Sequence, residues 1–343
     1  MADFILRGQP RIGGRMSSAL ELLMPRRKSL AGIEITPFFI KTSRVEKRKS
    51  GWFLTHWGEL PLPPGAVKCS YKSINVLDTD AFQNAVWSAV DAIGGEVFRM
   101  GVSLPNETMK ILVQEFDELP RSGAEIQKMV SWWVGKTFRI SPDEFVISYQ
   151  LLGKSPEGKS RLLVILAFRE IVLQYESLLK DQDIIPEIIC PSGINQLNFY
   201  SDEIPSTGII AFLGFFEAYF SFVVIEDGHI LFYHGVKKGP SDSHFNHHLD
   251  MTLQFFIDAC PDKKIERLYM GYPGHYYRDL SEGLMEIIAR DIVIIDESRF
   301  FSIENGHGRE EEFPMTTYSG AIGSARCVSY FSAAIGAAQS LSP

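Results

Sequence analysis

Hydrophobic and polar positions near the start of the chain alternate as they do in strands. Ile33–Lys41 and Gly51–Glu59 fit two strands joined by the charged turn 46–51. The stretch Leu60-Pro61-Leu62-Pro63-Pro64-Gly65 then interrupts regular structure. Apolar residues recur at helical spacing from Phe82 to Ile93 behind the capping residue Asp78, which predicts a helix.

Residues 105–185 have the pattern of a small α+β module. The pattern orders a strand, a helix, two strands and a helix. Ser122-Gly123-Ala124-Glu125 has the form of a capping box, so the first helix begins there. The turn-rich segment 153–159 lies between two apolar runs and predicts a hairpin.

The second half of the chain begins with a long apolar stretch. We interpret Gly208–Ile225 as one long strand, which the turn Glu226-Asp227-Gly228 joins to a second strand, His229–Val236. Further elements follow at shorter intervals. They are a helix over 245–260, a strand over 265–271, a helix over 280–289, a strand over 292–295 and a small-residue helix over 330–340.

Composition describes a globular protein with no segment long and apolar enough for a bilayer. Of its 343 residues 45% are hydrophobic and 22% charged, and the formal net charge is -8. Residues 1–60 are basic, with 11 Lys/Arg against 5 Asp/Glu, so the rest of the chain is strongly acidic. Nucleic-acid binders usually carry a basic stripe on a folded face, so we expect no nucleic-acid partner.

The leader and the cysteines suggest a compartment. The first residues lack the apolar core of a signal peptide. The four cysteines are far apart and form no CxxC pair, which favours a reducing cytoplasm. The basic leader, residues 1–29, contains Arg26-Arg27-Lys28 after an apolar stretch, so it is either a flexible solvated segment or a contact for anionic lipid.

Three stretches of the chain resemble the PilM family, the actin-like cytoplasmic components of type IV pilus assembly platforms. The stretches are Gly32-Ile33-Glu34-Ile35 with Ile40-Lys41, the proline-rich segment 60–66, and residues 145–186. The ending Ala334-Ile335-Gly336-Ala337-Ala338 is similar to the closing helix of that family. Both halves also open with a strand-turn-strand, as in the actin-like ATPase fold.

The resemblance implies an α/β fold of the actin-like ATPase (ribonuclease H-like) type. That fold is duplicated, and here it would carry an inserted small α+β subdomain and a reduced second half. The expected parts are a leader over 1–29, a first subdomain over 30–104 with 186–204, an insert of the type shared with FtsA over 105–185, and a second subdomain over 205–343.

The first expected phosphate turn departs from the family. Glu34 stands for an aspartate, and Thr36-Pro37-Phe38 stands for Gly-Ser-Ser, although Lys41 is retained. Pro37 has no N–H to donate to a phosphate. We therefore expect Pro37, Phe38 and Phe39 to fill the cleft, with both phenylalanines buried and no metal on Glu34.

The other nucleotide motifs are also altered. Gly214 remains in the second turn without the family's aspartate, and Phe212 adds bulk there. In the adenosine turn Gly271 and Gly274 enclose Tyr272-Pro273. About 28 residues separate Val236 from Ile265, where the family places a lid over the base. With Gly336 these residues form a degenerate cleft, for which we expect no cofactor; the alternative is ATP with Mg²⁺.

Trp132 lies off the apolar face of its predicted helix. It is either buried against an adjoining subdomain or offered to a partner. In the family, an N-terminal peptide of the membrane protein PilN binds between the first subdomain and the insert. The sequence therefore predicts a scaffold that binds a PilN-like peptide and other platform proteins at the inner face of the inner membrane. The alternatives are a weak or active ATPase and a GspL-like component of type II secretion.

Overall fold

The structure is a computed structural model. It describes residues 29–49, 51–95, 99–155, 157–201, 203–216, 218–237, 244–271, 292–295, 301–303 and 321–325. The leader up to residue 28, the helices expected at 280–289 and 330–340, and Tyr272, Gly274 and Gly336 lie outside the described residues.

The first sheet has six strands in the order β14-β3-β2-β1-β4-β8. They are β1 (Ser29–Ile35), β2 (Phe39–Arg48), β3 (Gly51–Pro61), β4 (Arg99–Leu104), β8 (Ile185–Pro191) and β14 (Phe301–Ile303). The strand expected over Ile33–Lys41 is divided in two, because the chain reverses at residues 36–38, where the resemblance places a turn, and β1 pairs antiparallel with β2. Pro37 favours this reversal, since it cannot donate to a sheet ladder.

The second sheet has five strands in the order β11-β10-β9-β12-β13. They are β9 (Ile209–Phe216), β10 (Tyr219–Glu226), β11 (His229–Val236), β12 (Arg267–Gly271) and β13 (Ile292–Ile295). The single strand expected over Gly208–Ile225 is wrong, because β9 ends at Phe216 and pairs antiparallel with β10, which begins at Tyr219. Since β9 and β10 are largely buried on both faces, their apolar run shows no period at which to place a turn.

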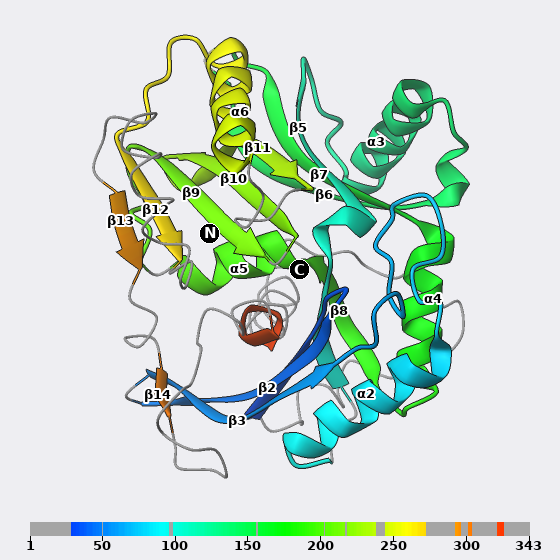
Figure 1. The fold of residues 1–343 in the computed structure, drawn as a ribbon. Coiled ribbons are helices and arrows are strands. Elements are labelled where there is room, and N and C mark those ends of the chain that lie inside the picture. The colour runs from blue at the N-terminus through cyan, green and yellow to red at the C-terminus, as the bar shows by residue number, and fades with distance from the viewer. Residues whose placement is uncertain are drawn as a thin grey trace, which may run out of the picture.

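The two sheets repeat one plan (Figure 1). In each, three antiparallel strands run in sequence, and two parallel strands extend the sheet from the first of them. Strand β14 adds to the outer edge of the first sheet, parallel to β3. The boundaries expected from the sequence assign all of residues 205–343 to the second subdomain, so they do not predict that β14 joins the first sheet.

The inserted module has the order expected for residues 105–185. Its sheet, β5-β7-β6, is covered on one face by a helix that begins after Ser122, whose hydroxyl accepts from the Glu125 N–H at 3.2 Å. The elements are β5 (Met109–Phe116), α3 (Gly123–Phe138), β6 (Phe145–Lys154), β7 (Ser160–Phe168) and α4 (Arg169–Lys180).

The other helical segments that the structure describes are α2 (Thr79–Ala92), η1 (Asn106–Thr108), η2 (Pro142–Glu144), α5 (Ser192–Tyr200) and α6 (Phe245–Ala259), and residues 321–325 are helical too. Helix α5 was not predicted, because all nine of its residues are buried and the sequence shows no amphipathic period. None of the described helices is both long and apolar enough to cross a membrane.

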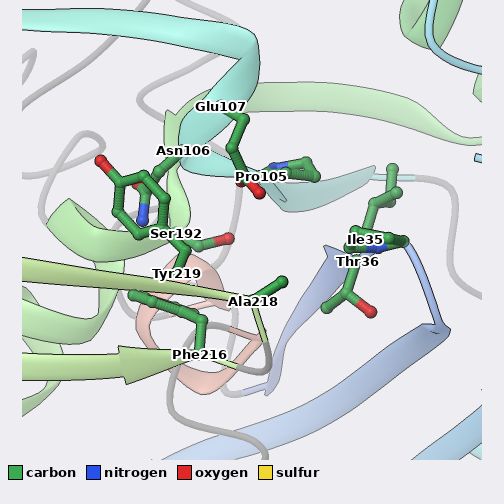
Figure 2. A pocket seen from close by; sticks show the side chains of 10 residues that line it. Ile35, Thr36, Pro105, Asn106, Glu107, Ser192, Phe216, Ala218 and Tyr219 are labelled. Atoms are coloured by element: carbon green, nitrogen blue, oxygen red, sulfur yellow. The ribbon is translucent and has the colours of Figure 1, made fainter. Parts of the chain in front are cut away.

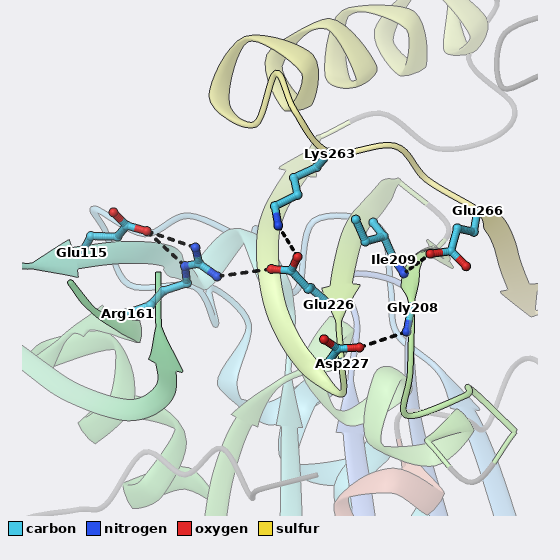
Figure 3. A network of polar contacts seen from close by, with 8 residues as sticks. All are labelled: Glu115, Arg161, Gly208, Ile209, Glu226, Asp227, Lys263 and Glu266. Carbon is cyan, nitrogen blue, oxygen red and sulfur yellow. Dashed lines mark hydrogen bonds and ion pairs between the residues drawn. The ribbon is translucent and has the colours of Figure 1, made fainter. Parts of the chain in front are cut away.

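A polar network joins the inserted sheet to the second sheet (Figure 3). The Arg161 guanidinium on β7 donates to Glu115 on β5 at 3.1 and 3.2 Å, and it lies 4.0 Å from the Glu226 carboxylate at the end of β10. Lys263 also pairs with Glu226. Strand β11 contacts β5 and β6 beside this network, so the insert packs against both halves of the protein.

Candidate functional site

A small pocket lies between the turns of the two repeated units (Figure 2). The β1–β2 turn forms one side, the β9–β10 turn the other, and the segment after β4 closes it. The lining residues are Ile35, Thr36, Pro37, Pro105, Asn106, Glu107, Ser192, Phe216, Ala218 and Tyr219. Its empty space is about 290 Å³, part of it open to solvent.

Thr36 takes up the hydrogen-bonding groups of the first turn. Its hydroxyl accepts from the N–H groups of Phe39 at 2.9 Å and Phe38 at 3.2 Å, and it bonds to the Phe39 carbonyl at 3.1 Å. Pro37 has no N–H. The turn's donors are thus satisfied within the turn, whereas a phosphate site needs backbone N–H groups that point at the ligand.

The expectation that both phenylalanines of this turn are buried is wrong. Phe38 is 44% exposed and Phe39 is half-buried. The Phe38 carbonyl accepts from the Leu62 N–H at 2.7 Å, which fastens the tip of the turn to the segment after β3 and leaves the ring in solvent. Of the three residues expected to fill the cleft from this side, only Pro37 lines the pocket.

Glu34 and Lys41 face each other across β1 and β2. Both are buried, and neither lines the pocket. Side chains alternate along a strand, so Glu34 points away from the face on which Ile35 meets the pocket. Of the expected Glu34, Thr36 and Lys41, the structure places only Thr36 at the site.

The turn of the second unit joins β9 to β10, so it lies later in the chain than the expected position around Gly214. Gly214 is inside β9, where a Cβ would meet the Gln196 Oε1 at 2.3 Å and the Ser221 Oγ at 2.8 Å, so this glycine permits close packing. Phe212 is fully buried against Tyr200, with ring centroids 5.4 Å apart, and does not line the pocket. Phe216 lies at the pocket instead.

Buried polar side chains form the floor beneath the pocket. The Ser192 hydroxyl donates to the Leu104 carbonyl at 3.0 Å and accepts from Ser103 at 3.2 Å. Asn195 donates to Ser103 at 3.0 Å, and the Asn106 Oδ1 accepts from the Gly193 N–H at 2.8 Å. These contacts join the end of β4 to the start of α5.

Two functional groups at the pocket were missed by the sequence reasoning. Glu107 brings a half-buried carboxylate, and Tyr219 brings a phenol whose pKa burial raises well above its usual value, with Tyr233 adding to the shift. Neither has a local signal, because Glu107 follows an ordinary strand and Tyr219 lies within an apolar run.

A close packing contact joins residues 321–325 to the first sheet. A Cβ on Gly32 would lie 1.9 Å from the Ala321 carbonyl oxygen, and one on Gly101 would lie 2.0 Å from that of Ser324. This segment, Ala321-Ile322-Gly323-Ser324-Ala325, is rich in small residues, a composition for which we expected close packing at 330–340.

Gly271, expected in the adenosine turn, ends β12 and is buried.

Trp132 is 63% exposed, so it is not buried against an adjoining subdomain. The Lys136 ammonium lies 5.0 Å from its ring centroid. Among the residues that the structure describes, no three His, Cys, Asp or Glu side chains gather closely enough to hold a metal ion.

Comparison with known proteins finds likeness in structure. No family model matches the chain, and no curated protein matches its sequence. A chain of the PilM–PilN type IV pilus biogenesis complex superposes with a TM-score of 0.71 at 15% identity, covering 90% of this chain and 99% of that chain. A Bacteroides thetaiotaomicron protein with an actin-like ATPase fold and unknown function gives 0.52 at 7% identity, covering 81% and 93%.

The duplicated sheets and these likenesses define an α/β protein with the actin-like ATPase fold. Within that fold, the chain is similar in structure to a component of the PilM–PilN complex over nearly its whole length.

Proposed function

We propose that this protein is a cytoplasmic scaffold of a type IV pilus or related assembly platform, at the inner face of the inner membrane. It binds the N-terminal peptide of a PilN-like membrane protein and contacts other platform proteins, without using a nucleotide. The observation that carries this proposal is the similarity to a chain of the PilM–PilN complex over 90% of the protein.

The first turn supports the proposal that no nucleotide binds. Thr36 accepts from the N–H groups of Phe38 and Phe39, and Pro37 has none, so a phosphate would have to compete with hydrogen bonds already made. Glu34, which stands where the family has an aspartate, pairs in register with Lys41 and does not line the pocket. The residues present do not fit Mg·ATP.

Mg·ATP binding tests this part of the proposal. A ligand present at about 100 times its Kd raises the free energy of unfolding by about 2.7 kcal/mol. We expect no rise in melting temperature with millimolar Mg·ATP and no heat of binding by calorimetry. A micromolar Kd would favour the second candidate, an ATP-binding protein of the PilM type.

Exposed apolar residues where the segment before α2 meets α4 of the insert support the peptide-binding part. Ile74, Leu77 and Leu173 are each more than half exposed, and we call them the junction patch. The Gln174 side chain connects them: its Oε1 accepts from the N–H groups of Asn75 and Val76, and its Nε2 donates to the Val76 carbonyl at 2.8 Å. The patch is thus held in place and left open.

A peptide titration tests the patch. We expect the N-terminal peptide of a PilN-like protein to bind the full chain, and Leu173→Asp to weaken it at least tenfold, because a hot-spot residue contributes about 2 kcal/mol. Leu151→Asp is the matched control, since Leu151 is 55% exposed against 52% for Leu173 but lies on β6. No binding to wild type, or equal loss in both variants, contradicts the proposal.

A further inference from the structure

The outer face of α3 carries a tryptophan between basic residues. Lys128, Trp132 and Lys136 follow one another at four-residue spacing, so they form one stripe along the helix, and Arg139 caps its end. All four are exposed, Trp132 by 63%. Helix α3 stands at the periphery of the protein, on the side of the inserted sheet away from the two large sheets (Figure 1).

The charge of this stripe is opposite to that of the protein. The whole chain has a formal net charge of -8. On the stripe, one acidic residue, Glu125, stands against Lys128, Lys136 and Arg139. Asp143 and Glu144 belong to η2, which packs against α3 near the Arg139 end of the stripe. Along the stripe itself, Lys128, Lys136 and Arg139 outnumber the single carboxylate of Glu125, although the whole chain is acidic.

A second tryptophan is equally exposed but has no basic residues one helical turn away. Trp87 on α2 is also 63% exposed. At four-residue spacing its neighbours are Gln83 and Asp91, so its surroundings are neutral to acidic. The combination of an indole with cations one turn away on both sides belongs to Trp132 and not to Trp87.

We propose that the Lys128–Trp132–Lys136 stripe of α3 is a contact for an anionic phospholipid surface. Tryptophan prefers the headgroup level of a membrane, where its ring is half in water. Lysines are attracted to anionic headgroups, and their stems lie along apolar surface while the ammonium groups stay in water. The Lys136 ammonium already lies 5.0 Å from the Trp132 ring.

The same face is poorly suited to an acidic peptide. Peptide hot spots are fully desolvated and ringed by contacts that exclude water. The neighbours of Trp132 on this face are charged and exposed, so they leave it wet. A few cations and one indole make a weak contact, which orients a protein at the membrane and does not hold it there alone. This inference stands independently of the proposed function.

Vesicle flotation tests the stripe with the full chain. The probes are vesicles of phosphatidylcholine alone and of phosphatidylcholine with phosphatidylglycerol, at low salt. We expect binding only to the anionic vesicles, weakened about tenfold in the charge-reversed Lys128→Glu/Lys136→Glu variant and severalfold in Trp132→Ala. Trp87→Ala is the matched control and should bind like wild type.

Three outcomes overturn the inference. One is no binding of wild type to anionic vesicles. Another is equal weakening in Trp132→Ala and Trp87→Ala. The third is binding that disappears when Arg26, Arg27 and Lys28 of the leader become glutamine but persists in Lys128→Glu/Lys136→Glu. Because the mutated stripe residues are exposed, unchanged melting temperatures should accompany all variants.

Discussion

At the scale of single residues, Thr36 decides what the first turn can do. Its hydroxyl is the acceptor for the N–H groups of Phe38 and Phe39. A threonine at that position is unremarkable in the sequence, because Ser and Thr often bond to nearby backbone in turns. Only the structure shows that this one hydroxyl accepts from both the Phe38 and the Phe39 N–H groups.

Thr36→Val should destabilise the protein by about 1–3 kcal/mol, because the shape is kept while two N–H groups lose their acceptor. Urea unfolding monitored by circular dichroism measures the loss. Thr36→Ser is the control, since it keeps the hydroxyl, and it should cost less than half as much. If Thr36→Val left the free energy of unfolding unchanged, water would accept from the two N–H groups without penalty, and the prediction would be wrong.

His234 gives a second prediction at this scale. Thr252 donates to the His248 carbonyl at 2.8 Å, so its oxygen accepts from the His234 Nδ1 at 2.9 Å. Burial lowers the pKa of His234. Below its usual pKa of about 6.5 the unfolded chain therefore binds more protons than the folded one, and stability falls as the pH falls.

Substitution of His234 should reduce this pH dependence. The difference in free energy of unfolding between about pH 7.5 and about pH 5 should be smaller in His234→Gln than in wild type. Exposed His229, at the start of β11, provides the control variant His229→Gln, which should match wild type. An unchanged pH dependence in His234→Gln would refute the prediction.

At the scale of elements, glycines set how closely residues 321–325 approach the first sheet. Gly32 on β1 and Gly101 on β4 are adjacent in register, and both lie under this segment. A side chain on either would overlap a backbone carbonyl of the segment. The contact thus depends on two strands that are far apart in sequence.

Gly32→Ala should cost about 1–3 kcal/mol, since its Cβ would meet the Ala321 oxygen at 1.9 Å and backbone must move. Thermal unfolding measures this. Gly123→Ala, at the start of α3, is the control, because its Cβ would meet only the Tyr149 hydroxyl, at 3.5 Å. That variant should be neutral or slightly stabilising. If Gly32→Ala and Gly123→Ala changed the free energy of unfolding equally, residues 321–325 would move to accept the new Cβ at little cost, and the prediction would be wrong.

At the scale of the whole molecule, the network around Arg161 ties the insert to the second half. The Arg161 side chain is 10% exposed, and it contacts carboxylates from two different sheets. Ion pairs that lose water are costly to break on one side, because a charge is left without its partner.

Arg161→Leu should lower the free energy of unfolding by about 1–3 kcal/mol and should uncouple the insert. A double-mutant cycle with Glu226→Gln measures the coupling. Arg48→Leu is the control, since its pair with Glu46 is about one-third exposed on both sides and such pairs contribute about 0–1 kcal/mol. If the effects of Arg161→Leu and Glu226→Gln on the free energy of unfolding were strictly additive, the two side chains would not interact and the prediction would be wrong.

The sequence by itself determined the parts that depend on neighbours along the chain. The cap at Ser122, the helix after Asp78 and the turn at Asp227-Gly228 all formed where local signals place them. The positive φ angles of Asp227 and Gly228 are those that such a hairpin turn requires. The duplicated actin-like plan was implied by the resemblance of short stretches of the chain to the PilM family, and the two sheets confirm it.

Tertiary structure alone decided the details of the site. The apolar run of β9 and β10 gives no local sign of the turn between the two strands. In the structure Phe212 is buried in the core and Phe216 lines the pocket. Phe38 is exposed because a distant N–H, that of Leu62, fastens its carbonyl. Glu107 meets the first turn only because β4, which precedes it, pairs with β1. Contacts between residues far apart in sequence are set by packing, and no local pattern encodes them.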